Sequence, residues 1–357
     1  MTGLLNDLMR DRADHLDAPE VDLAAIVRDG ARAVRRRRAA VVGGVAAASV
    51  VAVVSGAALL GTRGGGGDGQ VAGSPPAGVQ PLTWTTGRTL HTAGGESVDL
   101  AAEVRAWVWV GDDVVYTDPG HHVHLWQAGR DQVVGETMSP DTDLAELVSD
   151  GSFVAWVGAD GRVVRHDVAD GTTVRGPALP GERPRVTAID GAEVYLADSA
   201  GVYAWQPSTP SSYRTIDADP RAVVLDAESG TLVRTAPGRT VLLEREGTTL
   251  HVSAREFADL SPDAGLLSLD DADIGKVVDT TTGRGVTLDH GHEWAVGYQW
   301  LDPTTVATLA FDGMDDEASM DGWLLTCDAL TGACAPGEHL PALGEFQLPA
   351  GLHFAAP

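Results

Sequence analysis

From residue 82 onward, short apolar runs alternate with turns rich in Gly, Asp and Pro, and helical periodicity is almost absent. One apolar run recurs along this segment, with its central residues at Val115, Val154, Val194, Val233, Leu267 and Val306. The steps between them are 39, 40, 39, 34 and 39 residues, and a second apolar run follows each about ten residues later. A period near 40 residues with about four short strands per unit is typical of a β-propeller. The pattern therefore predicts an all-β fold of repeated blades.

The length and the ends of this segment indicate the number of blades. Residues 82–357 number 276, close to seven repeats of 39 residues. The C-terminal Glu345–Phe354 resembles the first two strands of a unit, whereas Arg88–Thr92 and Ser97–Leu100 resemble the last two. The two ends can therefore complete one blade together, which would leave no bare edge strand. We predict seven blades, with six as the alternative; a β-sandwich would not need a regular step.

Three units contain a hairpin with the pattern Asp-x-x-x-Gly after an apolar strand. These hairpins are Asp167–Gly171, Asp279–Gly283 and Asp328–Gly332. The Asp side chain can accept hydrogen bonds within its own turn, and the Gly supplies a positive φ. In these hairpins the sequence resembles the TolB-like and quinoprotein-like propellers, which have a WD40-like architecture. Other units depart from the pattern, at Trp126–Gly129, Trp205–Pro207 and Glu244–Gly247. The resemblance therefore implies the fold but not a quinone cofactor.

The N-terminal part of the chain has a different pattern. Residues 39–60 are 22 uncharged residues rich in Ala, Val and Gly, and as a helix they would reach about 33 Å, enough to cross a hydrocarbon core. Arg35, Arg36, Arg37 and Arg38 stand directly before them. Because excess arginine marks the cytoplasmic side, we predict a transmembrane helix with the N-terminus inside. A cleaved signal peptide or a buried Ala-rich helix would be the alternatives.

The segments on either side of residues 39–60 complete the predicted domain organisation. Residues 1–38 are too few to bury a core, and we expect a cytoplasmic amphipathic stub. Residues 61–81 are rich in Gly and Pro, which predicts a flexible linker, and residues 82–357 form the propeller. This layout resembles the single-pass, membrane-anchored propeller proteins of actinobacteria. That resemblance implies a propeller outside the cell membrane.

Charge narrows the range of partners. The chain of 357 residues has a formal net charge of −26. Residues 1–63 have a net charge of +2 and residues 64–357 of −28. So acidic a domain would be repelled by phosphate, which argues against nucleic acid as a partner. The same charge favours cationic partners.

The two cysteines, Cys327 and Cys334, flank the turn at Asp328–Gly332. On a two-stranded hairpin they would face one another, and outside the cell they should form a disulfide. A metal pair or two free thiols would be the alternatives.

Two groups of residues are weak candidates for metal ligands. His121, His122 and His124 form a tight group, and the last two would share one face of a strand, where they could hold a transition metal. The second group lies in a long insertion of the sixth unit, at Asp312, Asp315, Asp316 and Glu317. Carboxylate oxygens suit Ca²⁺, but the spacing fits no EF-hand. A polar turn and a solvated loop are the simpler interpretations.

The sequence contains neither a Gly-x-Ser-x-Gly elbow nor a Gly-x-x-x-x-Gly-Lys phosphate loop. We therefore assign no catalytic residue and no cofactor. The favoured interpretation is a non-enzymatic binding, sensing or scaffold module for a protein, peptide or envelope ligand. One alternative is an extracytoplasmic hydrolase or lyase on the same scaffold. Another is a signalling protein whose stub docks a cytoplasmic regulator such as a sigma factor.

Overall fold

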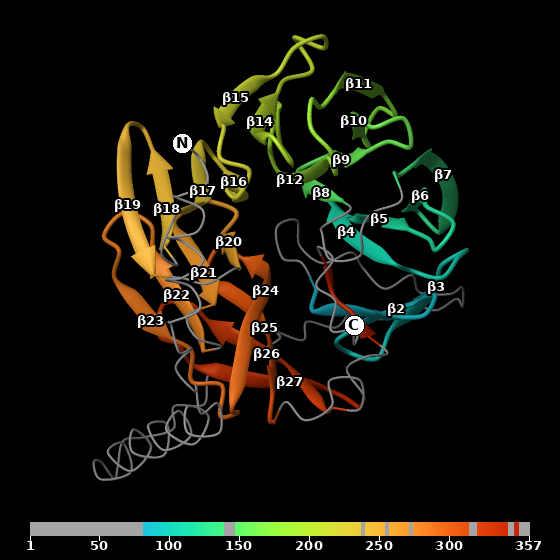
Figure 1. Cartoon of the computed structure of the whole chain (residues 1–357). Helices are drawn as coiled ribbons and strands as arrows, with labels where there is room; N and C mark the ends of the chain where they lie inside the picture. The colour runs from blue at the N-terminus through green and yellow to red at the C-terminus, as the bar shows by residue number, and fades with distance from the viewer. Residues whose placement is uncertain are drawn as a thin grey trace, which may run out of the picture. The chain divides into compact units, whose positions relative to one another are not determined.

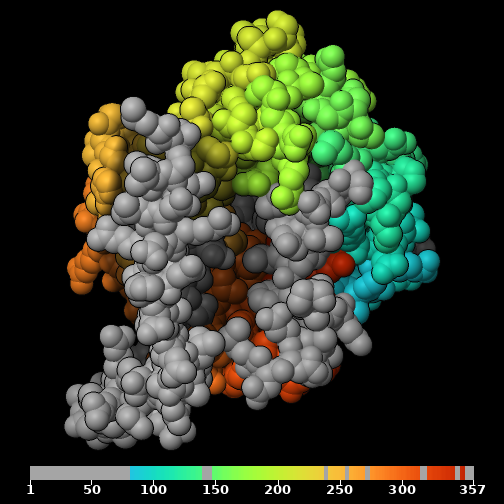
Figure 2. Space-filling model, viewed as in Figure 1, coloured from blue at the N-terminus to red at the C-terminus, as the bar shows by residue number. Residues whose placement is uncertain are grey.

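A computed structural model describes residues 81–138, 147–236, 240–253, 257–270, 274–313, 320–341 and 346–349. Every regular element in these residues is a β-strand. The strands form seven antiparallel sheets of four strands each, arranged as blades around a ring (Figure 1). In the space-filling view the blades follow one another around the ring in chain order (Figure 2).

We number the blades 1 to 7 in chain order and give the strands of each from the centre outward. Blade 1 contains β28 (Phe346–Gln347), β1 (Thr83–Thr86), β2 (Thr89–Thr92) and β3 (Ser97–Asp99). Blade 2 contains β4 (Ala106–Val110), β5 (Asp113–Thr117), β6 (His122–Gln127) and β7 (Arg130–Glu136). Blade 3 contains β8 (Val148–Asp150), β9 (Phe153–Val157), β10 (Arg162–Asp167) and β11 (Thr173–Ala178). Blade 4 contains β12 (Arg185–Asp190), β13 (Glu193–Asp198), β14 (Gly201–Trp205) and β15 (Arg214–Asp217).

The remaining three blades repeat the same order. Blade 5 contains β16 (Val224–Glu228), β17 (Thr231–Ala236), β18 (Thr240–Arg245) and β19 (Thr248–Ser253). Blade 6 contains β20 (Ala258–Leu260), β21 (Leu266–Asp270), β22 (Gly275–Asp279) and β23 (Gly285–Thr287). Blade 7 contains β24 (Trp294–Asp302), β25 (Thr305–Phe311), β26 (Gly322–Asp328) and β27 (Cys334–Leu340).

The prediction of a seven-bladed propeller is confirmed. The two recurring apolar runs are the second and third strands of blades 2 to 7. These middle strands are buried on both faces between neighbouring blades, as the burial of Val115 and Val154 shows, and a strand buried on both faces gives a continuous apolar run. Six blades and a β-sandwich are both excluded by the sheet topology.

The ring is closed by both ends of the segment, but the division of the closing blade differs from the prediction. Among the described residues, the C-terminal segment supplies one strand of this blade, the innermost strand β28, which pairs with β1 through Thr85 and Gln347 and through Thr86 and Phe346. The prediction assigned the first two strands of this blade to the C-terminal end. In the structure the second strand is β1, from the N-terminal end of the propeller. The repeat of apolar runs does not predict β1, because its sequence Thr-Trp-Thr-Thr is not an apolar run, although Thr and Trp favour strands.

Large aromatic side chains pack against glycines between neighbouring blades. Trp156 and Trp205 are almost completely buried. A Cβ added at Gly135, on the outer strand of blade 2, would lie 2.5 Å from Cζ2 of Trp156. A Cβ at Gly176, on the outer strand of blade 3, would lie 2.7 Å from Cε2 of Trp205. These glycines therefore provide the space that the indole of the next blade occupies.

The three Asp-x-x-x-Gly hairpins join the third and fourth strands of blades 3, 6 and 7, as the pattern predicted. In blade 6, Oδ1 of Asp279 accepts hydrogen bonds from the backbone N–H groups of Thr281 at 3.0 Å and Thr282 at 2.7 Å. Gly283 closes the turn by donating to the Asp279 carbonyl at 2.9 Å, with φ of 71°. The Asp and Gly therefore have the local roles expected of them.

The predicted stub, transmembrane helix and linker, with Arg35 to Arg38, lie outside the described residues. Within the residues that are described, no helix is long and apolar enough to span a membrane. The anchor therefore stays a prediction from the sequence.

Candidate functional site

A cavity of about 880 Å³ lies where the innermost strands of blades 2 to 7 converge. Its walls come from β4, β8, β12, β16, β20 and β24, together with Pro349 next to β28. Aromatic and aliphatic side chains make up part of the wall, including Trp109, Tyr298 and Trp300. The propeller topology thus brings side chains from distant parts of the chain to one concave place.

Four carboxylates from three blades line this cavity. Asp150 is the last residue of β8, Asp226 and Glu228 lie on β16, and Asp259 lies on β20. Each is partly exposed, because one side of the residue is open to the cavity while protein surrounds the others. The cavity therefore has a carboxylate wall that a ligand could reach.

Acids on the innermost strands, including Asp150 and Asp226 of the cavity wall, also connect neighbouring blades. Asp150 accepts a hydrogen bond from the backbone N–H of Gly191 in the next blade. Asp190 accepts one from the N–H of Gly230 at 2.8 Å. Oδ2 of Asp226 accepts one from the N–H of Leu260 at 2.6 Å. Backbone N–H groups of the following blade thus hold the carboxylates of Asp150, Asp190 and Asp226 in place.

Burial, together with repulsion between neighbouring acids, raises the pKa values of three of these groups. Burial raises the pKa of Asp226 to about 6, although backbone N–H groups of Leu260 and Ala227 oppose the shift. Burial, followed by repulsion from Asp150, raises the pKa of Glu228 to about 7. Burial and the neighbouring Asp226 raise the pKa of Asp259 well above its ordinary value. A positive charge beside these groups would favour their ionised forms.

The cavity also has two polar groups of another kind. Arg185 lies at the opposite end of β12 from Asp190, about 17 Å away at 3.3 Å per residue. Burial, and then the neighbouring Arg183, lower the pKa of Arg185. The Tyr298 side chain is 2% exposed, and its hydroxyl has no hydrogen-bond partner among the described residues. Tyr298 thus lines the cavity, but its unpaired hydroxyl is buried.

A second polar cluster lies in blade 2, at the connection between β5 and β6. Oδ2 of Asp118 is 3.0 Å from Nδ1 of His122 and 3.3 Å from Nε2 of His124. Nδ1 of His124 is 2.9 Å from Oδ1 of Asp131, and the Tyr116 hydroxyl donates to Oδ2 of Asp131 at 2.5 Å. The Tyr116 ring stacks on the His124 ring with centroids 4.6 Å apart.

The protonation of this cluster follows from its contacts. Burial opposes ionisation of Asp118, but hydrogen bonds from the His122 backbone and from the His122 and His124 rings outweigh it, so its pKa is lowered. Burial and the hydrogen bond to Asp131 raise the pKa of Tyr116. Tyr116 is therefore a neutral hydrogen-bond donor, and Asp118 is an anion.

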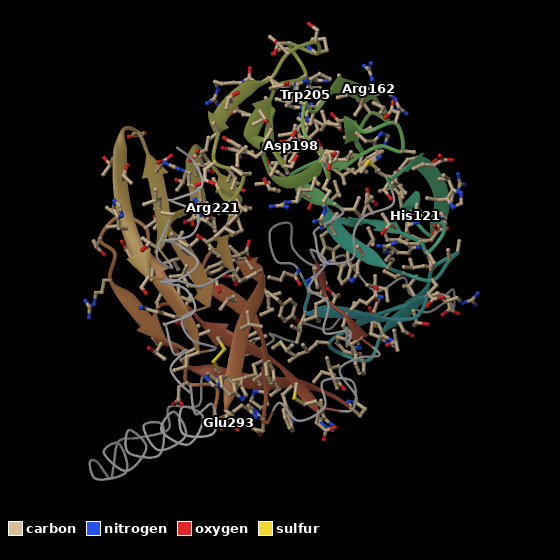
Figure 3. All side chains as sticks on the ribbon, viewed as in Figure 1. His121, Arg162, Asp198, Trp205, Arg221 and Glu293 are labelled. Atoms are coloured by element: carbon tan, nitrogen blue, oxygen red, sulfur yellow. A yellow bond between two sulfur atoms is a disulfide. The ribbon has the colours of Figure 1, made fainter. Side chains whose placement is uncertain are left out.

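Of the three histidines singled out from the sequence, the structure brings His122 and His124 together. His121 points to a different partner, with Nδ1 3.3 Å from Nη1 of Arg105; Figure 3 labels it in blade 2. Asp118 occupies the third position. It was missed because its proximity to His124 depends on the β5–β6 register, in which Tyr116 pairs with His124. The Asp-Pro-Gly-His turn before β6 was the available signal.

The other predicted site residues are only partly described. Cys327 and Cys334 form the predicted disulfide, with Cα atoms 4.0 Å apart on the paired strands β26 and β27. Asp312 faces His292, with Oδ2 3.1 Å from Nδ1 of its ring. Asp315, Asp316 and Glu317, the remainder of the possible calcium group, lie outside the described residues.

The cavity acids were not recognised from the sequence. One of them, Asp150, had a signal in the sequence, an Asp-Gly pair at the end of the first strand of a blade. Taken alone, an Asp-Gly pair indicates only a turn. The first strand of a blade is short, and its position at the centre of the ring follows only from the closed topology.

Comparisons with known proteins concern the fold. No family model matches the chain, and no curated protein matches it significantly. The computationally designed protein Ika8 shares 15% identity with a TM-score of 0.42, covering 74% of this chain and 90% of its own. A chain of the mitotic checkpoint complex shares 17% identity with a TM-score of 0.48, covering 79% and 90%. TolB of Agrobacterium tumefaciens shares 14% identity with a TM-score of 0.40, covering 60% and 86%. At such identities the similarity extends to the propeller fold alone.

Proposed function

We propose that the protein is a membrane-tethered binding module whose propeller, outside the membrane, receives a cationic segment of a protein or peptide partner in its central cavity. The observation that carries this proposal is the wall of four carboxylates from blades 3, 5 and 6 in one cavity. Propellers host many unrelated functions, so the proposal rests on the chemistry of the cavity.

A cationic ligand matches the electrostatic character of this wall. Glu228 has a raised pKa because of burial and because of repulsion from Asp150 and Asp226. An ammonium or guanidinium group among these carboxylates would replace repulsion with charge-assisted hydrogen bonds. The volume of 880 Å³ falls within the range of about 300–1,000 Å³ usual for ligand pockets, enough for a few side chains of a peptide. The negative charge of residues 64–357 would also speed the approach of a cation.

Binding is tested with the full-length chain in detergent and a fluorescent oligo-arginine peptide, followed by anisotropy. We expect saturable binding that weakens with added salt and strengthens as pH rises from about 5 to 8, because the carboxylates then ionise. Glu228→Gln should weaken binding by roughly tenfold, the value of one charge-assisted contact of about 1.4 kcal/mol.

The matched control is Glu338→Gln. It removes the same charge from an exposed position on β27, the outermost strand of blade 7, and should leave the affinity unchanged. An oligo-glutamate peptide should not bind. Equal losses in the two variants, or affinity that is independent of salt, would refute a specific role for the cavity.

The proposed location is tested separately with reporter fusions in cells. A reporter enzyme that is active only outside the membrane should be active when fused after residue 81 and inactive when fused after residue 38. Activity at both positions would contradict the orientation inferred from Arg35 to Arg38. Inactivity at both would contradict translocation altogether.

A further inference from the structure

We propose that Asp118, His122 and His124 form a Zn²⁺ site in blade 2 with one open coordination position. This site is separate from the central cavity, and the proposal does not depend on the proposed function.

The separations between the three side chains match those of ligands on one ion. Zn²⁺ binds His nitrogen and carboxylate oxygen at about 2.0–2.1 Å, so two ligands at a tetrahedral angle are about 3.3 Å apart. Oδ2 of Asp118 lies 3.0 Å from Nδ1 of His122 and 3.3 Å from Nε2 of His124. The three ligand atoms all lie within 4.8 Å of one another. The ion therefore requires only small side-chain movements.

Asp131 determines which nitrogen of His124 faces the proposed ion. Nδ1 of His124 lies 2.9 Å from Oδ1 of Asp131, whose other oxygen accepts from the Tyr116 hydroxyl at 2.5 Å. A neutral imidazole that donates from Nδ1 has a lone pair at Nε2. Nε2 lies 3.3 Å from Oδ2 of Asp118, so a Zn²⁺ between them would replace the hydrogen bond between this ring and the carboxylate and accept the Nε2 lone pair. A carboxylate behind a ligating His is the usual support in zinc sites.

The carboxylate of Asp118 is oriented in a similar way. Its Oδ1 accepts a hydrogen bond from the backbone N–H of His122 at 2.8 Å, which leaves Oδ2 directed at both imidazoles. The connection contains Gly120, where a Cβ would lie 3.1 Å from Nδ1 of His122 and 3.2 Å from Oδ1 of Asp118. The absence of a side chain at Gly120 keeps the donor atoms accessible.

Exposure indicates a site that is closed on one side and open on the other. The side chains of His124 and Asp118 are 8% and 14% exposed, whereas that of His122 is 45% exposed. Three protein ligands with one solvent-facing position leave room for a water molecule as the fourth ligand. Two imidazoles with one carboxylate suit Zn²⁺ and its transition-metal neighbours better than Ca²⁺ or Mg²⁺, which prefer oxygen ligands.

Zn²⁺ binding is measured on the full-length chain, purified without a polyhistidine tag and stripped with chelator, by competition with a chromophoric chelator. We expect about one tightly bound Zn²⁺ per chain. His122→Ala should lower the affinity by at least about 100-fold, and Asp131→Asn by about 10–100-fold, as for other supporting carboxylates. Thermal unfolding is measured in parallel. Added Zn²⁺ should raise the Tm of the unmodified chain but not that of His122→Ala.

The control variant is His339→Ala. The His339 side chain is 50% exposed and also pairs with an aspartate, with Nε2 3.4 Å from Oδ2 of Asp321, so it matches His122 in exposure and setting. It should bind Zn²⁺ like the unmodified chain. Because His122 is exposed, His122→Ala should unfold in chelator at the same temperature as the unmodified chain, which separates lost binding from lost folding.

Two results would overturn the proposal. The first is no saturable Zn²⁺ binding to the unmodified chain. The cluster would then be a hydrogen-bonded network in which His124 lies between the carboxylates of Asp118 and Asp131. The second is equal Zn²⁺ affinity in His122→Ala and His339→Ala, which would place any bound ion elsewhere.

Discussion

At the scale of single residues, Asp198 connects blade 4 to the chain segment that enters it. Its side chain is buried, with 5% of the residue exposed, and it is labelled in Figure 3. One oxygen accepts from the N–H of Gly181 at 2.7 Å, and the other from the N–H of Ala200 at 2.7 Å and from the Tyr203 hydroxyl at 3.2 Å. Loss of this carboxylate would leave several buried donors without partners.

We therefore expect Asp198→Ala to lower the free energy of unfolding by about 3 kcal/mol, measured by urea denaturation. Asp160→Ala is the control, since Asp160 is exposed and its contacts are an ion pair with Arg175 at 3.5 Å and a hydrogen bond from the backbone N–H of Arg162 at 3.2 Å. It should change the free energy by less than about 1 kcal/mol. Similar losses in the two variants would show that the hydrogen bonds of Asp198 contribute little.

Glu228 gives a prediction about pH. Its pKa in the folded chain is about 7, against 4.5 when unperturbed. The folded state thus binds more protons than the unfolded state between these values, and the free energy of unfolding falls as pH rises through this window. Glu228→Gln should match the unmodified chain near pH 4 and be more stable at pH 8. We expect about 1 kcal/mol there, because the half-exposed side chain is partly screened.

Melting temperatures at a series of pH values would check this. If the difference between the two proteins were constant across the range, the raised pKa of Glu228 would not contribute to stability.

At the scale of elements, the contact between β11 and the next blade depends on Gly176. A Cβ there would collide with Val163 and would lie 2.7 Å from Cε2 of the fully buried Trp205. Neither neighbour can move freely in a packed interior. Gly176→Ala should therefore destabilise the protein by about 2–3 kcal/mol, measured by thermal or urea unfolding.

The control for Gly176 is Arg175→Ala on the same strand, where the side chain is exposed. Its effect should be below about 1 kcal/mol. If Gly176→Ala were tolerated equally well, the blades would be able to separate enough to accept a methyl group.

Elements differ in how far the sequence predicts them. The middle strands of blades 2 to 7 could be predicted because both of their faces are buried. The innermost strands β8 and β20 have three residues each, too few to show alternation, and their acidic residues, Asp150 and Asp259, line the cavity. The disulfide could be predicted because both cysteines lie on one hairpin, where the pairing of β26 and β27 is local in the sequence. The contact of Asp118 with His124 could not, because it depends on strand register and rotamer.

At the scale of the whole molecule, the ring depends on a pairing between residues far apart in the chain. Deleting residues 346–357 would remove β28, expose the edge of β1 and remove Leu348, which is 2% exposed, from the core. We expect a clearly lower Tm and self-association through the bare edge, measured by thermal unfolding and light scattering. Deleting only residues 350–357 keeps β28. If this shorter deletion caused the same loss, closure by β28 would not be the cause.

The number of blades could be predicted because the repeat length and the segment length agree. The electrostatics of the centre could not, since Asp150 and Asp259 are 109 positions apart in the sequence and meet at the cavity only after the ring has closed.

The closing blade has a consequence for biosynthesis. β1 is made near the start of the propeller, but its inner partner β28 lies at Phe346–Gln347, some 260 residues later. A ribosome extends a chain at about 5–20 residues per second, so the edge of β1 stays unpaired for on the order of 13–50 s at these rates. Until synthesis has passed residue 347, the nascent chain has six blades and an incomplete seventh. The open edge of that blade must not pair with a strand of another chain during this time. A translation product that stops before residue 346 lacks β28, so an unpaired β1 edge distinguishes such a product from the finished chain.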